Sequence, residues 1–205
     1  YKLGKWLPYI DIQQRSVSYN FEGLDNNLEF GEQTVDYTFL NPKFGLTYSN
    51  KSYQVYASFG QGNREPVRDD FRNNKPDDWP EHESLDNLEL GYRFERGRKQ
   101  FGITLYNMMY QNQLVLTGAV NDVGEAVRTN VKDSYRRGVE LEAQYPATKK
   151  LQVGGNLTLS ENKIKSFTEY VGEWDGAYGQ ISNTYNNTNI SFSPEVVGMF
   201  MLQYK

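Results

Sequence analysis

The sequence predicts an all-β protein built from long antiparallel strands. Apolar residues recur at every second position, several of these runs exceed the usual strand length of about 5–6 residues, and no long segment has the 3.6-residue period of a helix. In "LELGYRF", Leu88, Leu90, Tyr92 and Phe94 fall on one face of the expected strand. The segments "YQVYASFG", "RRGVELEAQY" and "LQVGGNLTLSEN" repeat this alternation, so two-faced strands are expected along most of the chain.

The amino-acid composition indicates which classes of protein this chain can belong to. Of 205 residues, 38% are hydrophobic and 23% charged, which is the range of globular proteins, but the mean hydropathy of −0.75 is polar for a chain that must bury a core. An aromatic content of 15% argues against intrinsic disorder. The net charge of −4 offers no basic excess for neutralising phosphates, so nucleic acid is not an expected partner.

The sequence contains no recognisable catalytic or metal-binding motif. The chain has no cysteine, and a single histidine, His82, cannot build a histidine-based metal site. Ser134 and Ser160 lie outside any Gly-x-Ser-x-Gly elbow, and there is no glycine-rich phosphate loop. The adjacent acids at 69–70 and 77–78 lack the alternate ligand spacing of a calcium loop. We therefore expect no enzyme, no cofactor and no metal site.

The connections between the expected strands alternate in length. Segments 49–52, 95–99 and 146–150 are tight turns, whereas four connections are longer and polar, at 21–40, 64–84, 117–125 and 167–185. Short turns at one end and long loops at the other are typical of a transmembrane β-barrel. No stretch approaches the roughly 18 apolar residues of a membrane helix, so any membrane span must consist of strands. The expected strands are 3–20, 41–50, 52–63, 85–96, 99–116, 126–146, 150–166 and 186–205.

The polar faces of these strands carry a dense set of charges. The charges at alternate positions are Glu89, Arg93, Glu95, Arg136, Glu140 and Glu142. Such a face suits the wall of a wide, wet or plugged interior, but a solvated face of a soluble β-protein fits the same pattern. In a barrel, the residues expected to point inward are Glu89, Arg93, Glu140, Glu142, Asn156 and Thr158. Those expected to point outward are Leu88, Leu90, Val139, Leu141, Val153, Leu157 and Leu159.

One long connection concentrates aromatic residues. "EYVGEWDGAYGQISNTY" places Tyr170, Trp174, Tyr178 and Tyr185 among glycine and asparagine, a composition suited to flat contact with a chelate or sugar. An interfacial aromatic girdle, or packing within the loop, accounts for the same residues. These four are therefore candidate ligand contacts with a structural alternative.

Three segments resemble the later barrel strands of TonB-dependent outer-membrane receptors, in the same order. They are "ASFGQGNREPVRDDF", "ESLDNLELGYRFERGRKQFGITLYNMMYQNQLVLTGAVNDVGEAVRTNVKDSYRRGVELEAQY" and "LQVGGNLTLSENKIKSFTEY", and the resemblance covers residues 41–205. It implies an antiparallel transmembrane barrel segment of about eight strands within a plugged barrel of about 22. The family's TonB box and plug are absent from these residues, as are the terminal strands, so residues 1–205 are expected to be part of the barrel domain of a longer protein.

The resemblance also implies a function. Family members lie in the outer membrane of Gram-negative bacteria and import scarce nutrients, here most simply an iron chelate, with energy relayed by TonB. The implied partners are the TonB complex, the receptor's own plug, outer-membrane lipid and an iron chelate or similar small ligand. A passive outer-membrane porin or adhesin and a soluble β-sandwich binding module remain alternatives. Plug sequence upstream would exclude the former, and folding without detergent would favour the latter.

The segment "NREPVRDDF", residues 63–71, lies where an expected strand becomes a loop. Pro66 lacks an N–H and should end the ladder pairing of strand 52–63. In the barrel interpretation Arg64 and Glu65 turn toward the plug or lumen, together with Glu89, Arg93, Arg136, Glu140 and Glu142. Arg64 is expected to anchor the junction on a carboxylate or carbonyl of the plug or a neighbouring strand. Local salt bridges within the loop are the alternative.

Overall fold

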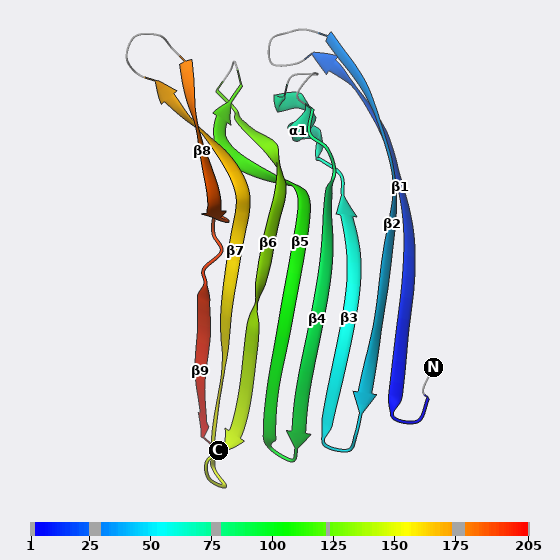
Figure 1. Cartoon of the computed structure of the whole chain (residues 1–205), viewed down its shortest axis with the longest axis vertical. Coiled ribbons are helices and arrows are strands. Elements are labelled where there is room, and N and C mark those ends of the chain that lie inside the picture. The colour runs from blue at the N-terminus through cyan, green and yellow to red at the C-terminus, as the bar shows by residue number, and fades with distance from the viewer. Residues whose placement is uncertain (1–2, 25–29, 75–78, 122–123, 174–178, 205) are drawn as a thin grey trace.

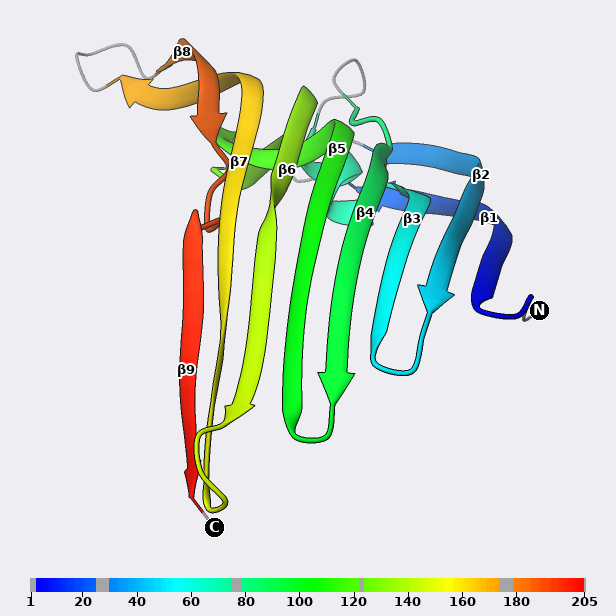
Figure 2. The same ribbon diagram turned by 60° about the horizontal axis from the view of Figure 1, so that its bottom comes forward.

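One curved antiparallel sheet makes up nearly the whole molecule (Figures 1 and 2). The computed structural model describes residues 3–24, 30–74, 79–121, 124–173 and 179–204. Within them, strands β1 to β8 follow one another across the sheet in chain order, and β9 pairs with β7. The elements are β1 (Trp6–Leu24), β2 (Phe30–Ser49), β3 (Tyr53–Arg64), α1 (Arg68–Asn73), β4 (Glu83–Arg96), β5 (Lys99–Val120), β6 (Ala126–Pro146), β7 (Leu151–Glu173), β8 (Gly179–Asn189) and β9 (Val196–Tyr204).

The last two strands share one partner. β8 pairs with β7 from Lys163 to Glu173, and β9 pairs with it from Leu151 to Leu159, so together they line the full length of β7. A continuous strand over 186–205 was therefore a wrong prediction. Two backbone features interrupt it: Phe192 has a positive φ of 57°, and Pro194 has no N–H to donate.

Several strands are longer than their apolar alternation predicts. β1 and β2 reach Leu24 and Phe30, β5 runs to Val120 and β7 runs to Glu173, so most of the segments expected as loops at 21–40, 117–125 and 167–185 are strand. On β2 the apolar alternation changes face, from Leu40 and Phe44 on one face to Val35, Tyr37 and Phe39 on the other, so one continuous period-two pattern does not reveal the whole strand. The short helix α1, inside 64–84, was also missed, because six residues cannot display a helical period.

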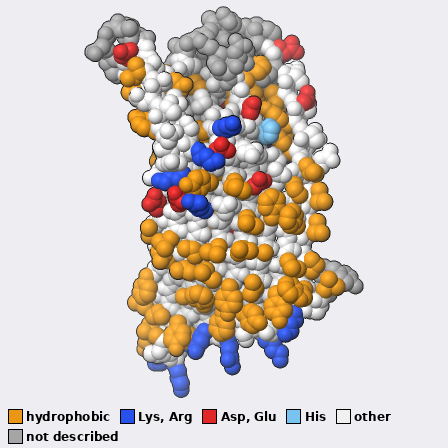
Figure 3. Space-filling model, viewed as in Figure 1, with side chains coloured by type: hydrophobic (Ala, Val, Ile, Leu, Met, Phe, Trp, Pro, Cys, Tyr) orange, Lys and Arg blue, Asp and Glu red, His pale blue; other side chains and the backbone are white. Residues whose placement is uncertain are grey.

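An apolar row crosses the sheet on one face, called here the apolar face. Its members are paired in register from strand to strand: Leu46, Ala57, Leu90, Leu105, Val139, Leu159 and Val196. Leu90 and Leu105 are each 48% exposed, because no second layer covers them. Figure 3 shows this face, where hydrophobic side chains fill a broad band.

The band has the height of a bilayer core. On β4 it comprises four alternate positions, from Leu88 to Phe94, and on β2 five, from Leu40 to Tyr48. At about 3.3 Å per residue these runs span roughly 20–27 Å, close to the band of about 25 Å of outer-membrane barrels. An uncovered apolar surface of this size needs lipid rather than water. Among the described helices, none is long and apolar enough to cross a membrane.

The opposite, polar face supports a small core at the loop end. Buried side chains gather there rather than mid-sheet, and they include Val35, Phe39, Phe71, Val131 and Ile164. α1 lies against this face, with the Phe71 ring 6.4 Å from that of Tyr19 on β1. The fold thus places a packed cluster at the end of the long connections and leaves the middle of the polar face open.

Candidate functional site

A pocket of about 730 Å³ opens on the polar face in the middle of the sheet. Five of the predicted inward charges line it together: Glu89, Arg93, Arg136, Glu140 and Glu142. Asn156 and Thr158 line it too, as do Tyr56 and Tyr106. Strand register explains the grouping, since Arg93, Gly102, Glu142 and Asn156 lie in one cross-strand row. That this wall faces a lumen or plug stays a prediction.

Ion pairs and hydrogen bonds organise the charges of this pocket. Arg93 Nη2 lies 3.4 Å from Glu142 Oε1, two strands away, and both side chains are more than half exposed. Arg136 Nη1 donates to Ser193 Oγ at 2.7 Å, which ties the wall to the break between β8 and β9. Glu140 lies between Thr104 and Thr158 in the register. The wall therefore presents cations, carboxylates and hydroxyls side by side, a surface suited to a polar ligand or protein partner.

Glycines in mid-strand shape the pocket. An added Cβ at Gly91 would lie 2.0 Å from the Tyr56 ring, so Tyr56 lies flat over this glycine, with its hydroxyl 3.2 Å from Thr104 Oγ1. Gly102 makes the same room for Glu142, whose Oε1 would lie 2.5 Å from a Cβ. The alternation pattern alone did not predict this role, although a glycine inside a strand is a recognised sign of close approach.

Arg64 and Glu65 lie outside the pocket and have partners within the chain. Arg64 pairs with the Glu83 carboxylate on β4, and Glu83 also accepts a hydrogen bond from the Leu114 N–H at 2.6 Å. Glu65 accepts two hydrogen bonds from Arg15 on β1, at 2.6 and 3.2 Å. The strand-to-loop junction is thus bound to both neighbouring hairpins, and contact with a plug stays a prediction.

The rest of "NREPVRDDF" fixes α1 on the polar face. The Asp70 side chain is 4% exposed and accepts hydrogen bonds from Arg128 Nε at 2.7 Å and Nη2 at 2.8 Å. Asp70 Oδ2 also accepts the Val67 N–H at 2.8 Å, which caps the helix. Pro66 is fully buried, and Tyr19 donates to its carbonyl at 3.2 Å. Local sequence patterns gave no signal for a pair 58 residues apart.

A second aromatic group lies on this face, on β2 and beside β4. The rings of Tyr37 and Phe39 stack at 5.4 Å, and His82 lies 5.2 Å from Phe39. The Arg15 guanidinium covers Phe39 at 5.1 Å. His82 also lies 5.8 Å from the Tyr37 ring, so it packs against both aromatic rings. In the described part of the chain, no group of three or more His, Cys, Asp or Glu residues could hold a metal ion.

The four aromatic candidates of the long connection are not brought together as one surface. Trp174 and Tyr178 lie outside the described residues. Tyr185 on β8 pairs with Phe167 and is 47% exposed, whereas Tyr170 pairs with Ser182. Positions 167 and 170 on β7 point to opposite faces, so Tyr170 and Tyr185 do too. Ligand contact by these residues stays a prediction.

A single sheet with an uncovered apolar band on one face and a polar wall on the other is part of the wall of a transmembrane β-barrel. The family model described as "TonB dependent receptor-like, beta-barrel" matches residues 9–204. The chain therefore belongs to the TonB-dependent receptor family, a family of outer-membrane transport receptors. The resemblance is confirmed, and the single described sheet shows that a β-sandwich was a wrong alternative.

Solved structures share this fold at low sequence identity. The siderophore receptor PiuA from Acinetobacter baumannii matches with a TM-score of 0.74 at 14% identity, over 98% of this chain and 29% of that one. The FrpB iron transporter from Neisseria meningitidis matches with 0.60 at 15%, over 89% and 30%. The copper transporter OprC matches with 0.63 at 14%, over 96% and 36%. The chain thus spans about a third of these proteins. No curated protein matches the sequence.

Proposed function

We propose that the chain forms barrel strands of an outer-membrane receptor for TonB-dependent uptake of a scarce nutrient, and that this nutrient is an iron chelate. The proposal rests chiefly on the pocket of the polar face, where Arg93, Arg136, Glu140 and Glu142 line a wall opposite the apolar band. In the full protein this wall would face the plug or the ligand path.

The nature of the nutrient is drawn from the related structures. PiuA is described as a siderophore receptor, FrpB as an iron transporter and Fiu from E. coli K12 as a ferric-catecholate import receptor. OprC is described as a copper transporter, so copper is the competing cargo. The wall combines cations, carboxylates and hydroxyls, which suit hydrogen bonding to the polar groups of a chelate.

Growth of a deletion strain tests this proposal. The strain lacking the whole receptor gene should lose growth on one iron chelate in iron-limited medium, and a plasmid copy should restore it. Cobalamin and copper belong in the same panel, and a strain without TonB should show the same loss. Unchanged growth on every iron chelate, with a defect confined to copper, would assign the receptor to the metal itself; no defect anywhere would remove the import function.

Substitutions in the wall separate uptake from assembly. Arg136→Gln keeps a donor near Ser193 but removes the cation, and should lower uptake several-fold without changing the amount of receptor in the membrane. Lys165→Gln is the matched control, because it also removes one positive charge, but outside the pocket. Lys165 Nζ lies 3.7 Å from Asp133 Oδ2. Equal uptake by both variants would argue that the wall does not face the ligand path.

A further inference from the structure

A strongly basic rim ends the sheet on the side of the tight turns. The basic rim consists of Lys5, Lys51, Arg96, Arg98, Lys99, Lys149 and Lys150, all of which are exposed. The turns at 49–52, 95–99 and 146–150 hold one acid, Glu95, although the whole chain carries a net charge of −4. Figure 3 shows Lys and Arg side chains projecting below the apolar band. The rim thus has the opposite sign to the rest of the chain.

The cations of the basic rim lack acidic partners in the sheet. Within the described ranges, no ion pair joins any of them to Asp or Glu, whereas Arg137, Lys163 and Lys165 higher on the sheet each have a carboxylate within 4.0 Å. Arg98 donates to the Lys149 carbonyl at 3.0 Å and to Gln152 Oε1 at 3.2 Å. These bonds hold two turns side by side and so keep like charges close. An anion from outside the sheet would relieve this repulsion.

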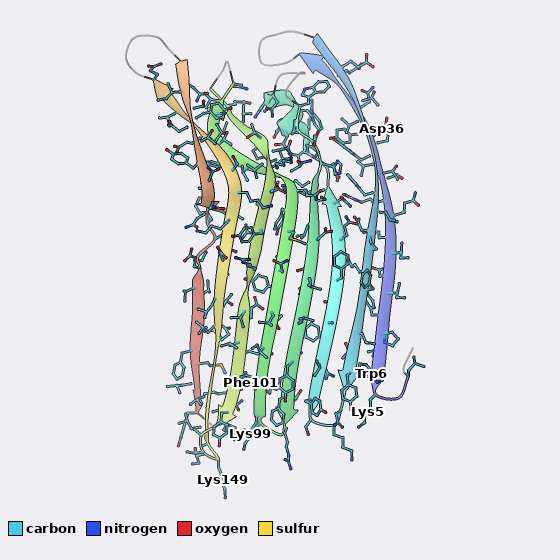
Figure 4. All side chains as sticks on the ribbon, viewed as in Figure 1. Lys5, Trp6, Asp36, Lys99, Phe101 and Lys149 are labelled. Carbon is cyan, nitrogen blue, oxygen red and sulfur yellow. The ribbon has the colours of Figure 1, made fainter. Side chains whose placement is uncertain are left out.

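Aromatic rings lie directly beside these cations. Lys5 Nζ lies 5.8 Å from the ring centre of Tyr48, and Lys99 Nζ lies 5.1 Å from that of Tyr145. Figure 4 shows Lys5 with Trp6, and Lys99 with Phe101, at the same end of the sheet. Tyr and Trp mark the interface of a bilayer, and long basic side chains reach from there to the headgroups. The basic rim therefore lies at headgroup depth.

We propose that the basic rim binds anionic phospholipid headgroups, with phosphatidylglycerol as the representative lipid. This inference rests on the membrane placement in the proposed function. Clusters of four to eight Lys and Arg at a membrane surface are typical of anionic-lipid binding, and each cation strengthens the attraction roughly fivefold. Short turns lie on the periplasmic side of such barrels, so the leaflet concerned is the periplasmic one.

The distribution of acids makes this attraction directional. Asp36, labelled in Figure 4, lies at the far end of the sheet, where Asp69, Glu125 and Glu169 also lie. An anionic leaflet would thus attract the end with the tight turns and repel the end with the long connections. The basic rim would hold the barrel at a fixed depth and orientation as well as select its lipid neighbours.

The test measures which lipids the complete receptor retains. The full-length protein is placed in nanodiscs of phosphatidylethanolamine with a minority of phosphatidylglycerol, extracted in mild detergent, and its bound lipids are quantified. Wild type should carry phosphatidylglycerol at several times its bulk share. The variant Lys99→Gln/Lys149→Gln/Lys150→Gln should reduce this enrichment roughly fivefold or more. About 1 M sodium chloride, where the Debye length is about 3 Å, should do the same to wild type.

A matched triple variant controls for net charge. Lys132→Gln/Lys163→Gln/Lys165→Gln removes the same charge higher on the sheet, where Lys163 and Lys165 already face Glu195 and Asp133. This control variant should retain the enrichment of phosphatidylglycerol. Heat-dependent gel mobility should show that the control variant and the rim variant are both folded. Equal enrichment in wild type and rim variant would overturn the proposal, as would equal loss in both variants. A rim variant that keeps its lipids but loses a cross-linked periplasmic protein would assign the rim to that protein instead.

The readout is independent of transport. Selective retention of phosphatidylglycerol by a receptor that imports no nutrient would leave this inference standing and remove only the proposed function. Nutrient uptake by a receptor that shows no selectivity for phosphatidylglycerol would support the proposed function and overturn the lipid-binding inference.

Discussion

Arg128 on β6 donates two hydrogen bonds to the buried carboxylate of Asp70 in α1, at 2.7 and 2.8 Å. The two residues are 58 positions apart, one on a strand and one in the connection between β3 and β4, and Asp70 also caps its own helix through the Val67 N–H. One carboxylate therefore serves both the local fold of α1 and its attachment to the polar face. The ion pair of Arg72 in α1 with Glu125, at 3.3 Å, is by contrast exposed.

Asp70→Ala should release α1 from the sheet. Because it leaves the Arg128 guanidinium, 33% exposed, without its acceptor and removes the cap, the local cost should be about 3 kcal/mol. Arg128→Lys keeps the charge but cannot make the paired bonds, and should cost about 1 kcal/mol. Protease cleavage of the β3–β4 connection in the folded receptor measures the release. Arg72→Ala, which breaks only exposed pairs, should change cleavage little; strong cleavage there would point to those pairs as the real attachment.

Leu157→Arg should destabilise the receptor in a bilayer far more than Thr158→Arg. Leu157 lies in the apolar band, where an arginine near the bilayer midplane costs about 2–4 kcal/mol, whereas Thr158 lines the polar pocket. Denaturant titration of the full-length protein in lipid vesicles gives both values. Similar losses at the two adjacent positions would contradict the assignment of the faces.

Gly91→Ala should strain the wall of the pocket. Its Cβ would lie 2.0 Å from the Tyr56 ring, so the ring must leave its place, at about 1–3 kcal/mol. In a Tyr56→Ala background the same change should cost much less, because nothing then opposes the Cβ. Gly62→Ala on β3 is the control, since a Cβ there meets nothing within 4 Å. Additive effects of the changes at 91 and 56 would mean that the two residues do not touch.

Alternation along single strands predicted the faces but not the contacts across them. Leu88 and Leu90 could be placed on one side of their strand because period two needs no knowledge of partner strands. The Arg93–Glu142 pair, by contrast, depends on a register spanning β4, β5 and β6, which no local pattern encodes. α1 was missed for a related reason: its stability comes from Arg128 and from packing of Phe71, not from its own six residues.

β3 ends at a junction that carries Arg64. Arg64 was expected to anchor it on a carboxylate, and the carboxylate it contacts is that of Glu83 on the neighbouring strand. The Arg64 side chain is 62% exposed, so Arg64→Ala should cost only about 0.5–1 kcal/mol. Glu83→Ala should cost more, about 1–3 kcal/mol, because it also leaves the buried Leu114 N–H without an acceptor.

Glu83→Gln separates these two contributions, because it keeps an oxygen for Leu114 and loses the ion pair. Its stability should match that of Arg64→Ala in the same denaturant titration. If Arg64 also reaches the plug of the complete receptor, Arg64→Ala should impair ligand uptake and plug retention. Glu83→Gln should leave both intact. Arg64→Lys should keep uptake and plug retention only in part. Unchanged uptake in Arg64→Ala together with a defect in Arg68→Ala would assign the anchor to the wrong arginine. If neither Arg64→Ala nor Arg68→Ala impaired uptake, the only role of Arg64 and Pro66 would be to end the strand.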